Sequence, residues 1–167
     1  MGVQNRMEAA RLWDGLFFIT CIHSQRTPNE GPAKKELNYI MVIERLDGCF
    51  SVCKLPDFSL VDWSDPFLFL ARTDTEYSLV CSAGRAPANA CSCEHGWRAL
   101  RVAGTLDFSL TGVLSMLTAL LAAAQIPVFA VSTYDTDYIL TRAADFDRAI
   151  CALAGGGCIF DERVDGG

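Results

Sequence analysis

The chain of 167 residues contains only two histidines and no run of basic residues. His23 lies near the N-terminus and His95 lies in a segment with loop composition, and neither completes a Ser-His-Asp set or another recognisable acid–base arrangement. The formal net charge is −6, and an acidic chain without a basic run repels phosphate backbones. The sequence therefore argues against an enzyme and against a protein that binds nucleic acid.

The N-terminus lacks the features of a secretion signal. Glu8 and Asp14 precede a short apolar run at residues 16–22, and no small-residue cleavage site follows it. We therefore expect a cytoplasmic protein whose eight cysteines are mostly reduced and mostly buried. The spacing Cys91-x-Cys93-x-His95 is narrower than zinc sites favour and lacks a fourth ligand, so we expect no metal site, and the sequence indicates no cofactor.

One stretch without charge, residues 108–134, is long enough to cross a bilayer. Serines, threonines and glycine interrupt it, and Gln125 and Pro127 are typical of the end of a helix. A β-branched run follows them. The pattern therefore predicts a buried helix followed by a buried strand, and not a membrane span.

The chain before residue 37 resembles an extension, because its end, "SQRTPNEGPAKKE", is rich in proline, glycine and charge. Residues 9–22 fit either a short helix or a short strand. After the extension, Asp47-Gly48 predicts a hairpin turn between two strands. The strands expected in this half are residues 39–46, 49–55, 67–72 and 77–82, with a turn at residues 73–76.

The second half alternates strands and helices. Apolar residues at helical spacing from Leu110 to Ala124 predict a helix, with Ser109 as its N-cap. A second helix is expected around Phe146 to Leu153, ended by three glycines. The expected strands are residues 97–102, 128–134, 137–141 and 158–160, with a turn at residues 135–136. The order βαββαβ predicts a ferredoxin-like α+β fold, an antiparallel sheet with both helices on one face.

Two phrases occur twice in the same order. "DFSLV" at residues 57–61 matches "DFSLT" at 107–111, and "PFLFLARTDTEYSL" at 66–79 matches "PVFAVSTYDTDYIL" at 127–140. Two ordered matches indicate a decayed tandem duplication. Similar turn chemistry in two unrelated hairpins is the alternative.

The connection at residues 107–112 joins a strand to a helix. Free backbone N–H groups at a helix N-terminus favour a carboxylate, Gly112 permits a close approach, and Asp107 and Asp137 could hold an ammonium group. This pattern matches a free amino acid. A capped helix beside a tight hairpin would explain the same residues.

The motifs "GWRAL", "LDFSLTG" and "STYDTDY", within residues 96–153, resemble the C-terminal module of small tandem ACT-domain proteins. The resemblance is weaker for residues 37–85, and it extends distantly to cytosolic arginine sensors and to the ACT modules of aspartate kinases. It implies an extension (1–36), a first, abbreviated ACT-like module (37–95) and a second ACT module (96–167). It also implies a non-enzymatic regulatory protein, a homodimer or one that acts on a partner protein, that binds an amino acid between modules. The implied ligand-binding residues are Asp107, Phe108, Ser109, Leu110, Thr111, Gly112, Val113, Val128, Ser132, Thr133, Tyr134, Asp135, Thr136 and Asp137.

Two other functions compete with this interpretation. ACT-like sheets can pair edge to edge, so the chain could be an interaction module with no ligand. The same fold also occurs in RNA-recognition domains and in acylphosphatases. The excess of acidic over basic residues argues against RNA recognition. Acylphosphatase chemistry requires an arginine in the phosphate-binding loop, where this chain has Asp107.

Overall fold

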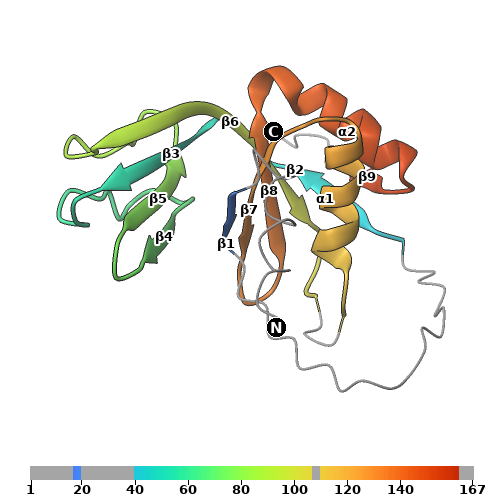
Figure 1. The fold of residues 1–167 in the computed structure, drawn as a ribbon, viewed down its shortest axis with the longest axis horizontal. Coiled ribbons are helices and arrows are strands. Elements are labelled where there is room, and N and C mark those ends of the chain that lie inside the picture. The colour runs from blue at the N-terminus through green and yellow to red at the C-terminus, as the bar shows by residue number, and fades with distance from the viewer. Residues whose placement is uncertain (1–16, 20–39, 107–109, 162–167) are drawn as a thin grey trace, which may run out of the picture.

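The computed structural model describes residues 17–19, 40–106 and 110–161, which form nine strands and two α-helices (Figure 1). The strands are β1 (Phe17–Ile19), β2 (Val42–Arg45), β3 (Phe50–Leu55), β4 (Phe69–Arg72), β5 (Tyr77–Ser82), β6 (Ser92–Val102), β7 (Val128–Ser132), β8 (Asp137–Arg142) and β9 (Ile159–Asp161). The helices are α1 (Val113–Ala123) and α2 (Phe146–Gly155). The mixed α+β fold that the sequence predicts is confirmed.

The strand β6 connects the two halves of the molecule (Figure 1). Its first residues pair with β3, and its last residues pair with β2 on the same side and with β8 on the other. The complete path runs β1-β7-β8-β6-β3-β5-β4, with β2 beside β6 and β9 beside β2. Every part of the sheet therefore depends on one strand of 11 residues.

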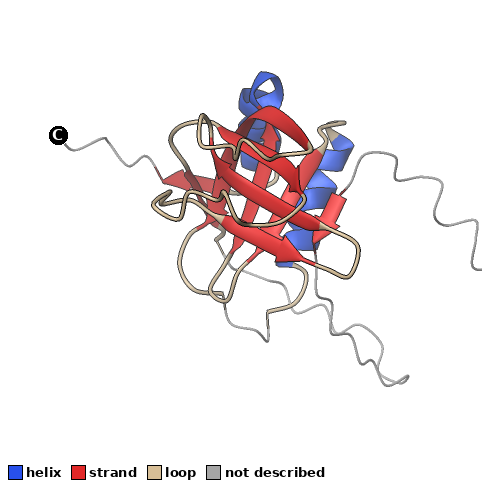
Figure 2. Cartoon of the chain, turned by 90° about the vertical axis from the view of Figure 1, so that its left-hand side faces the viewer, coloured by secondary structure: helices blue, strands red, loops and turns tan. Residues whose placement is uncertain are grey.

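The second half carries both helices. The elements β6, α1, β7, β8, α2 and β9 follow one another in the predicted βαββαβ order, and Figure 2 shows α1 and α2 behind the strands, on one face. The core between helices and sheet includes Leu117, Leu121, Leu153, Leu100 and Ile139, each almost fully buried. The sheet is mixed and not purely antiparallel, because β1 runs parallel to β7 and β2 runs parallel to β9.

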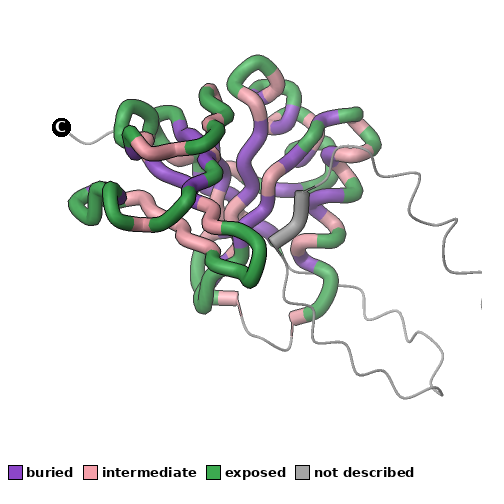
Figure 3. Tube along the Cα trace, turned by 60° about the vertical axis from the view of Figure 1, so that its left-hand side comes forward, coloured by how far each residue is buried: buried purple, intermediate pink, exposed green. Residues whose placement is uncertain are grey.

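The first half has no helix among its described residues. Its sheet, β3-β5-β4, packs one face on β6, β7 and β8 through a second core that includes Phe50, Trp97 and Leu140. The other face is covered by residues from the segments before β4 and after β5, among them Val61 and Ala86. Figure 3 shows the buried parts of the chain gathered in the interior of the molecule, with exposed segments around them. Loops thus take the place that helices hold in the second half.

The aspartate Asp65 fixes one of these loops to the sheet. Its side chain is only 6% exposed, and it accepts hydrogen bonds from the Ser82 N–H and hydroxyl and from the Phe67 N–H at 2.7–3.0 Å. Burial alone would raise the pKa of Asp65, but these hydrogen bonds and Arg85 outweigh it and lower the pKa below its ordinary value.

We expect Asp65→Asn to lower the free energy of unfolding at pH 7 by about 1–3 kcal/mol, because an amide replaces a charged acceptor of three hydrogen bonds. The pKa of Asp65 is lower in the folded state than in the unfolded state. The stabilisation by Asp65 is therefore complete above the unfolded-state pKa and is lost as the pH falls through the folded-state pKa. The difference between wild type and variant should therefore shrink below about pH 4. Urea unfolding at pH 7 and pH 3, with the exposed Asp74→Asn as control, measures this, and a difference independent of pH would contradict it.

The expected hairpin at Asp47-Gly48 does not form. Arg45 pairs with Leu100 and Phe50 pairs with Trp97, so β2 and β3 lie one after the other along the same side of β6. Four residues of this segment, 46–49, stand opposite two of β6, 98–99. Gly48 has φ +83°, a left-handed conformation that glycine adopts without strain. Asp47-Gly48 therefore forms a bulge in the strand pairing and does not reverse the direction of the chain. Consequently β2, expected with the first half, pairs with β6 and β9 of the second.

The helix ends also differ from the sequence prediction. The helix α1 begins at Val113, three residues after the predicted first apolar position, and Gly112 is its N-cap with φ 88°. Ser109, the expected N-cap, lies outside the described residues. The helix α2 contains the predicted Phe146, Ala149 and Leu153 as its buried face. No helix in the described ranges is long and apolar enough to cross a membrane.

Two of the described cysteines form a disulfide, whereas the others are free, in line with the expectation of mostly reduced thiols. Cys53 of β3 and Cys93 of β6 are register partners across the two strands. Among the other described cysteines, Cys81 and Cys158 are buried, but Cys49, Cys91 and Cys151 are exposed, contrary to the expectation of mostly buried cysteines. Burial, and then the nearby Asp65, raise the pKa of Cys81 to about 11, so this thiol is unreactive at neutral pH.

Candidate functional site

The candidate site is built on the turn between β7 and β8, residues 133–136. The Thr133 N–H and hydroxyl both donate to the Thr136 carbonyl, each at 2.9 Å. The Thr136 N–H donates back to the Thr133 hydroxyl at 3.3 Å. These bonds close a tight reversal, which places Ser132 and Asp137 opposite each other at the strand ends.

Ser132 and Asp137 form a polar pair beside this turn. The Ser132 hydroxyl donates to a carboxylate oxygen of Asp137 at 2.6 Å. Ser132 is exposed and Asp137 is half-buried. A carboxylate in this position remains accessible to a cation, and a serine hydroxyl beside it can donate or accept.

The turn lies against the connection between β6 and α1. Thr136 is only 7% exposed, and its hydroxyl donates to the Val102 carbonyl at 2.6 Å. The Leu106 N–H donates to the Asp135 carbonyl at 2.7 Å. The turn and the start of α1 consequently lie at the same end of the molecule (Figure 1).

Among the described residues, no side chain caps the N-terminus of α1, and no acidic residue lies in its first turn. The first N–H groups of an α-helix have no intrahelical acceptor, so this end favours an anion. Thr111 and Gly112 are exposed at this end. The side chains of Thr111 and Ser115 are the nearest described hydroxyls in sequence.

The implied ligand-binding residues have different positions in the structure. Ser132, Thr133, Thr136 and Asp137 are hydrogen-bonded together, and the Asp135 backbone joins them to the connection before α1. Tyr134 is 79% exposed at the tip of the turn. Val113 and Val128 belong to the core beneath α1, and Leu110 packs against it. Asp107, Phe108 and Ser109 lie outside the described residues.

The first repeated phrase forms a hairpin like the second. In the turn at residues 73–76 the Thr73 N–H donates to the Glu76 carbonyl at 2.8 Å, as Thr133 does to Thr136. The Asp-Thr dipeptide of the repeated phrase, however, lies one position later in the second turn than in the first. Asp74-Thr75 fill the second and third positions of one turn, and Asp135-Thr136 fill the third and fourth of the other. Because side chains alternate along a strand, the tyrosines that follow face different cores: Tyr77 packs with the outer one and Tyr138 with the inner one.

Sequence reasoning missed a groove of about 260 Å³ between the two hairpins. Its walls are β4 and β5 of the first half and β7 of the second, and Ser132 is the one implied ligand-binding residue among its described lining residues. The repeated phrase at residues 66–79 and 127–140 could have indicated the groove, because the first strand of each copy, β4 and β7, forms one of its walls. The described lining is Leu68, Phe69, Leu70, Ala71, Ser78, Leu79, Val80, Phe129, Val131 and Ser132.

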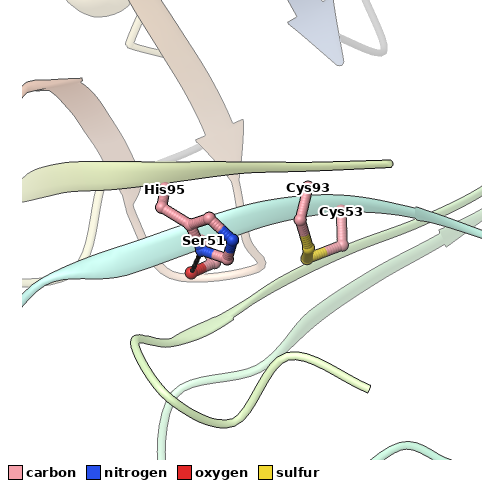
Figure 4. The surroundings of a disulfide bond; sticks show 4 residues. All are labelled: Ser51, Cys53, Cys93 and His95. Carbon is pink, nitrogen blue, oxygen red and sulfur yellow. Dashed lines mark hydrogen bonds between the residues drawn. A yellow bond between two sulfur atoms is a disulfide. The ribbon is translucent and has the colours of Figure 1, made fainter. Parts of the chain in front are cut away.

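Two of the three possible metal ligands in the cysteine-rich segment have other partners. Cys93 is bonded to Cys53, and the His95 Nδ1 lies 2.8 Å from the Ser51 hydroxyl (Figure 4). No group of three or more metal-ligating side chains occurs among residues 17–19, 40–106 and 110–161.

A comparison with protein families gives a match for the second half of the chain. The profile of the ACT domain family matches residues 92–155, from β6 to α2. The chain contains an ACT domain. The match includes β6, α1, the β7–β8 turn and α2, so the candidate site lies largely within the ACT domain. ACT domains are regulatory ligand-binding modules.

Solved structures resemble this ACT-domain protein beyond the matched segment. A protein from Agobacterium tumefaciens is 27% identical with a TM-score of 0.65, over 72% of this chain and 92% of that one. A Vibrio cholerae protein of unknown function, described as a possible transport protein, is 18% identical with a TM-score of 0.54 over 71% and 91%. Aspartate kinase from Clostridium acetobutylicum is 11% identical, with a TM-score of 0.51, over 70% of this chain and 34% of that one. The last two likenesses concern the fold alone. Among curated proteins no match was found.

Proposed function

We propose that this protein is a non-enzymatic regulatory protein that binds a free amino acid between its two halves. The observation that carries the proposal is the Ser132–Asp137 pair, beside a turn that is fixed to the connection leading to α1. Asp137 supplies a carboxylate for an ammonium group, and the uncapped start of α1 supplies N–H groups for a carboxylate. The ACT domain match supports a regulatory ligand.

We also propose that the two halves are decayed copies of one module, the second copy having kept its helices. The likeness of the two hairpin turns and the order of the repeated phrases support this. In the first copy Ala71 and Arg72 precede the turn, and Arg72 stacks on Tyr77 with 5.2 Å between the guanidinium carbon and the ring centre. The polar ligand contacts are accordingly assigned to the second copy.

A panel of the twenty amino acids tests the function. A ligand that binds only the folded state raises its melting temperature, so at least one amino acid should do so in a thermal-shift measurement on the full chain. If none of the twenty changes the melting temperature or gives a heat signal in calorimetry, the proposal is wrong and an interaction module without ligand remains.

We expect Asp137→Ala to abolish the shift produced by the active amino acid, because the ligand ammonium loses its counter-charge. The unliganded protein should lose little stability, since the Ser132–Asp137 hydrogen bond is partly exposed and a hydrogen bond contributes on the order of 1 kcal/mol net. Asp74→Ala, in the turn of the other hairpin, is the matched control and should keep the full shift. Unfolding of the unliganded Asp137→Ala variant would instead make Asp137 a structural residue of the turn.

A further inference from the structure

We infer that the groove between β4 and β7 receives the side chain of an aliphatic or aromatic amino acid, whose main-chain ends lie at the rim near Ser132. The inference rests on the proposed function and specifies its ligand. The groove lies where the two halves meet: Leu68 to Ala71 line it from the first half, and Phe129 and Val131 line it from the second. A ligand there would contact both copies of the repeated hairpin.

The chemistry of the groove favours an apolar side chain. Its described lining residues include no aspartate, glutamate, lysine, arginine or histidine, and its only polar side chains are Ser78 and Ser132. A guanidinium, ammonium or carboxylate placed among these residues would lose water without gaining a counter-charge, which costs several kcal/mol. An aliphatic or aromatic side chain gains about 25 cal/mol per Å² of surface removed from water.

The size of the groove favours a single amino acid over a longer peptide. A volume of about 260 Å³ corresponds to roughly nine water-sized groups at about 30 Å³ each. This is the scale of one free amino acid with a branched or aromatic side chain. An extended peptide of several residues requires more space than the groove offers.

The rim supplies partners for the main-chain ends. In antiparallel pairs, hydrogen-bonded and non-hydrogen-bonded positions alternate. Thr73 and Glu76 are bonded, so Leu70, opposite Leu79, directs its N–H and carbonyl away from β5. No described strand pairs with β4 on that side. The Leu70 N–H and carbonyl can therefore supply one further donor and one further acceptor for the main-chain ends of the ligand, in addition to the partners that the proposed function assigns to them. Ser132 lines the groove and donates to Asp137.

The test is a comparison of side-chain classes in the thermal-shift panel. We expect leucine, isoleucine, valine, methionine or phenylalanine to raise the melting temperature by about 3–6 °C at a free concentration about ten times the Kd. Arginine, lysine, aspartate and glutamate should have no effect. Stabilisation by arginine or another charged amino acid alone would overturn this inference and leave the proposed function standing, whereas indifference to all twenty would remove the proposed function itself.

Two further measurements locate the ligand. Ala71→Leu adds three carbons to a half-buried residue that lines the groove, and should abolish the shift, whereas Ala122→Leu, on a half-buried alanine of α1, should keep it. Because Ala71→Leu could disturb folding, methyl NMR of the wild-type chain gives an independent answer. The active amino acid should shift the methyl signals of Leu70 and Val131 more than those of Leu117 and Leu153. A full shift in folded Ala71→Leu, or methyl changes confined to the α1 core, would overturn the assignment.

Discussion

Replacing Leu117 by alanine is expected to lower the free energy of unfolding by about 2–5 kcal/mol. Leu117 is 0% exposed in the core between α1 and the sheet. Truncation removes apolar contacts and leaves a cavity that α1, held on one side by the sheet and on the other by α2, cannot close completely. For a chain of this length the melting temperature should fall by roughly 5–15 °C.

Leu60→Ala is the matched control. Leu60 is 55% exposed on the loop before β4, and a substitution at such a position changes stability by about 0.5 kcal/mol or less. Urea unfolding followed by circular dichroism compares the two variants. Equal midpoints would show that α1 does not depend on this core for its attachment.

Loss of the Cys53–Cys93 disulfide is expected to cost about 2–4 kcal/mol. The two cysteines are 40 residues apart in sequence, so the bond closes a loop that contains β4, β5 and the Asp65 anchor. Opening this loop enlarges the unfolded ensemble more than the folded one. Urea unfolding with and without a dithiol reductant should give two separate midpoints, and Cys53→Ala combined with Cys93→Ala should match the reduced protein.

The exposed Cys151 provides the control, because it has no partner among the described cysteines. Cys151→Ala should unfold like wild type in both conditions and keep its sensitivity to reductant. Titration of free thiols in the folded protein gives a second readout, since Cys53 and Cys93 should react only after reduction. An unfolding midpoint that does not respond to reductant would contradict the prediction.

Local patterns predict the elements whose partners are close in sequence. The hairpins β4–β5 and β7–β8 follow from strand runs around Asp-Thr turns. The buried positions of α2 follow from the spacing of Phe146, Ala149 and Leu153. In each case the hydrogen bonds or contacts that stabilise the element join residues only a few positions apart.

Pairing between distant segments is not visible in such patterns. The parallel contact of β2 with β9 joins Val42 to Ile159, and the disulfide joins two positions of a set of eight cysteines that allows many pairings. Asp47-Gly48 has the composition of a turn in either a hairpin or a bulge, and only the availability of β6 as a common partner decides between them. The groove escaped prediction for the same reason, because its walls come from β4 and β7, about 60 residues apart.

The shared strand β6 also limits how this protein can be divided. A cut near Gly96, between the two proposed modules, would break a continuous strand, leaving β3 with one piece and β8 with the other. Neither half could then be expressed, exchanged or fused to another protein alone without an exposed sheet edge that invites aggregation. A gene encoding this protein is therefore expected to gain or lose the two halves together, although they look like separable copies in the sequence.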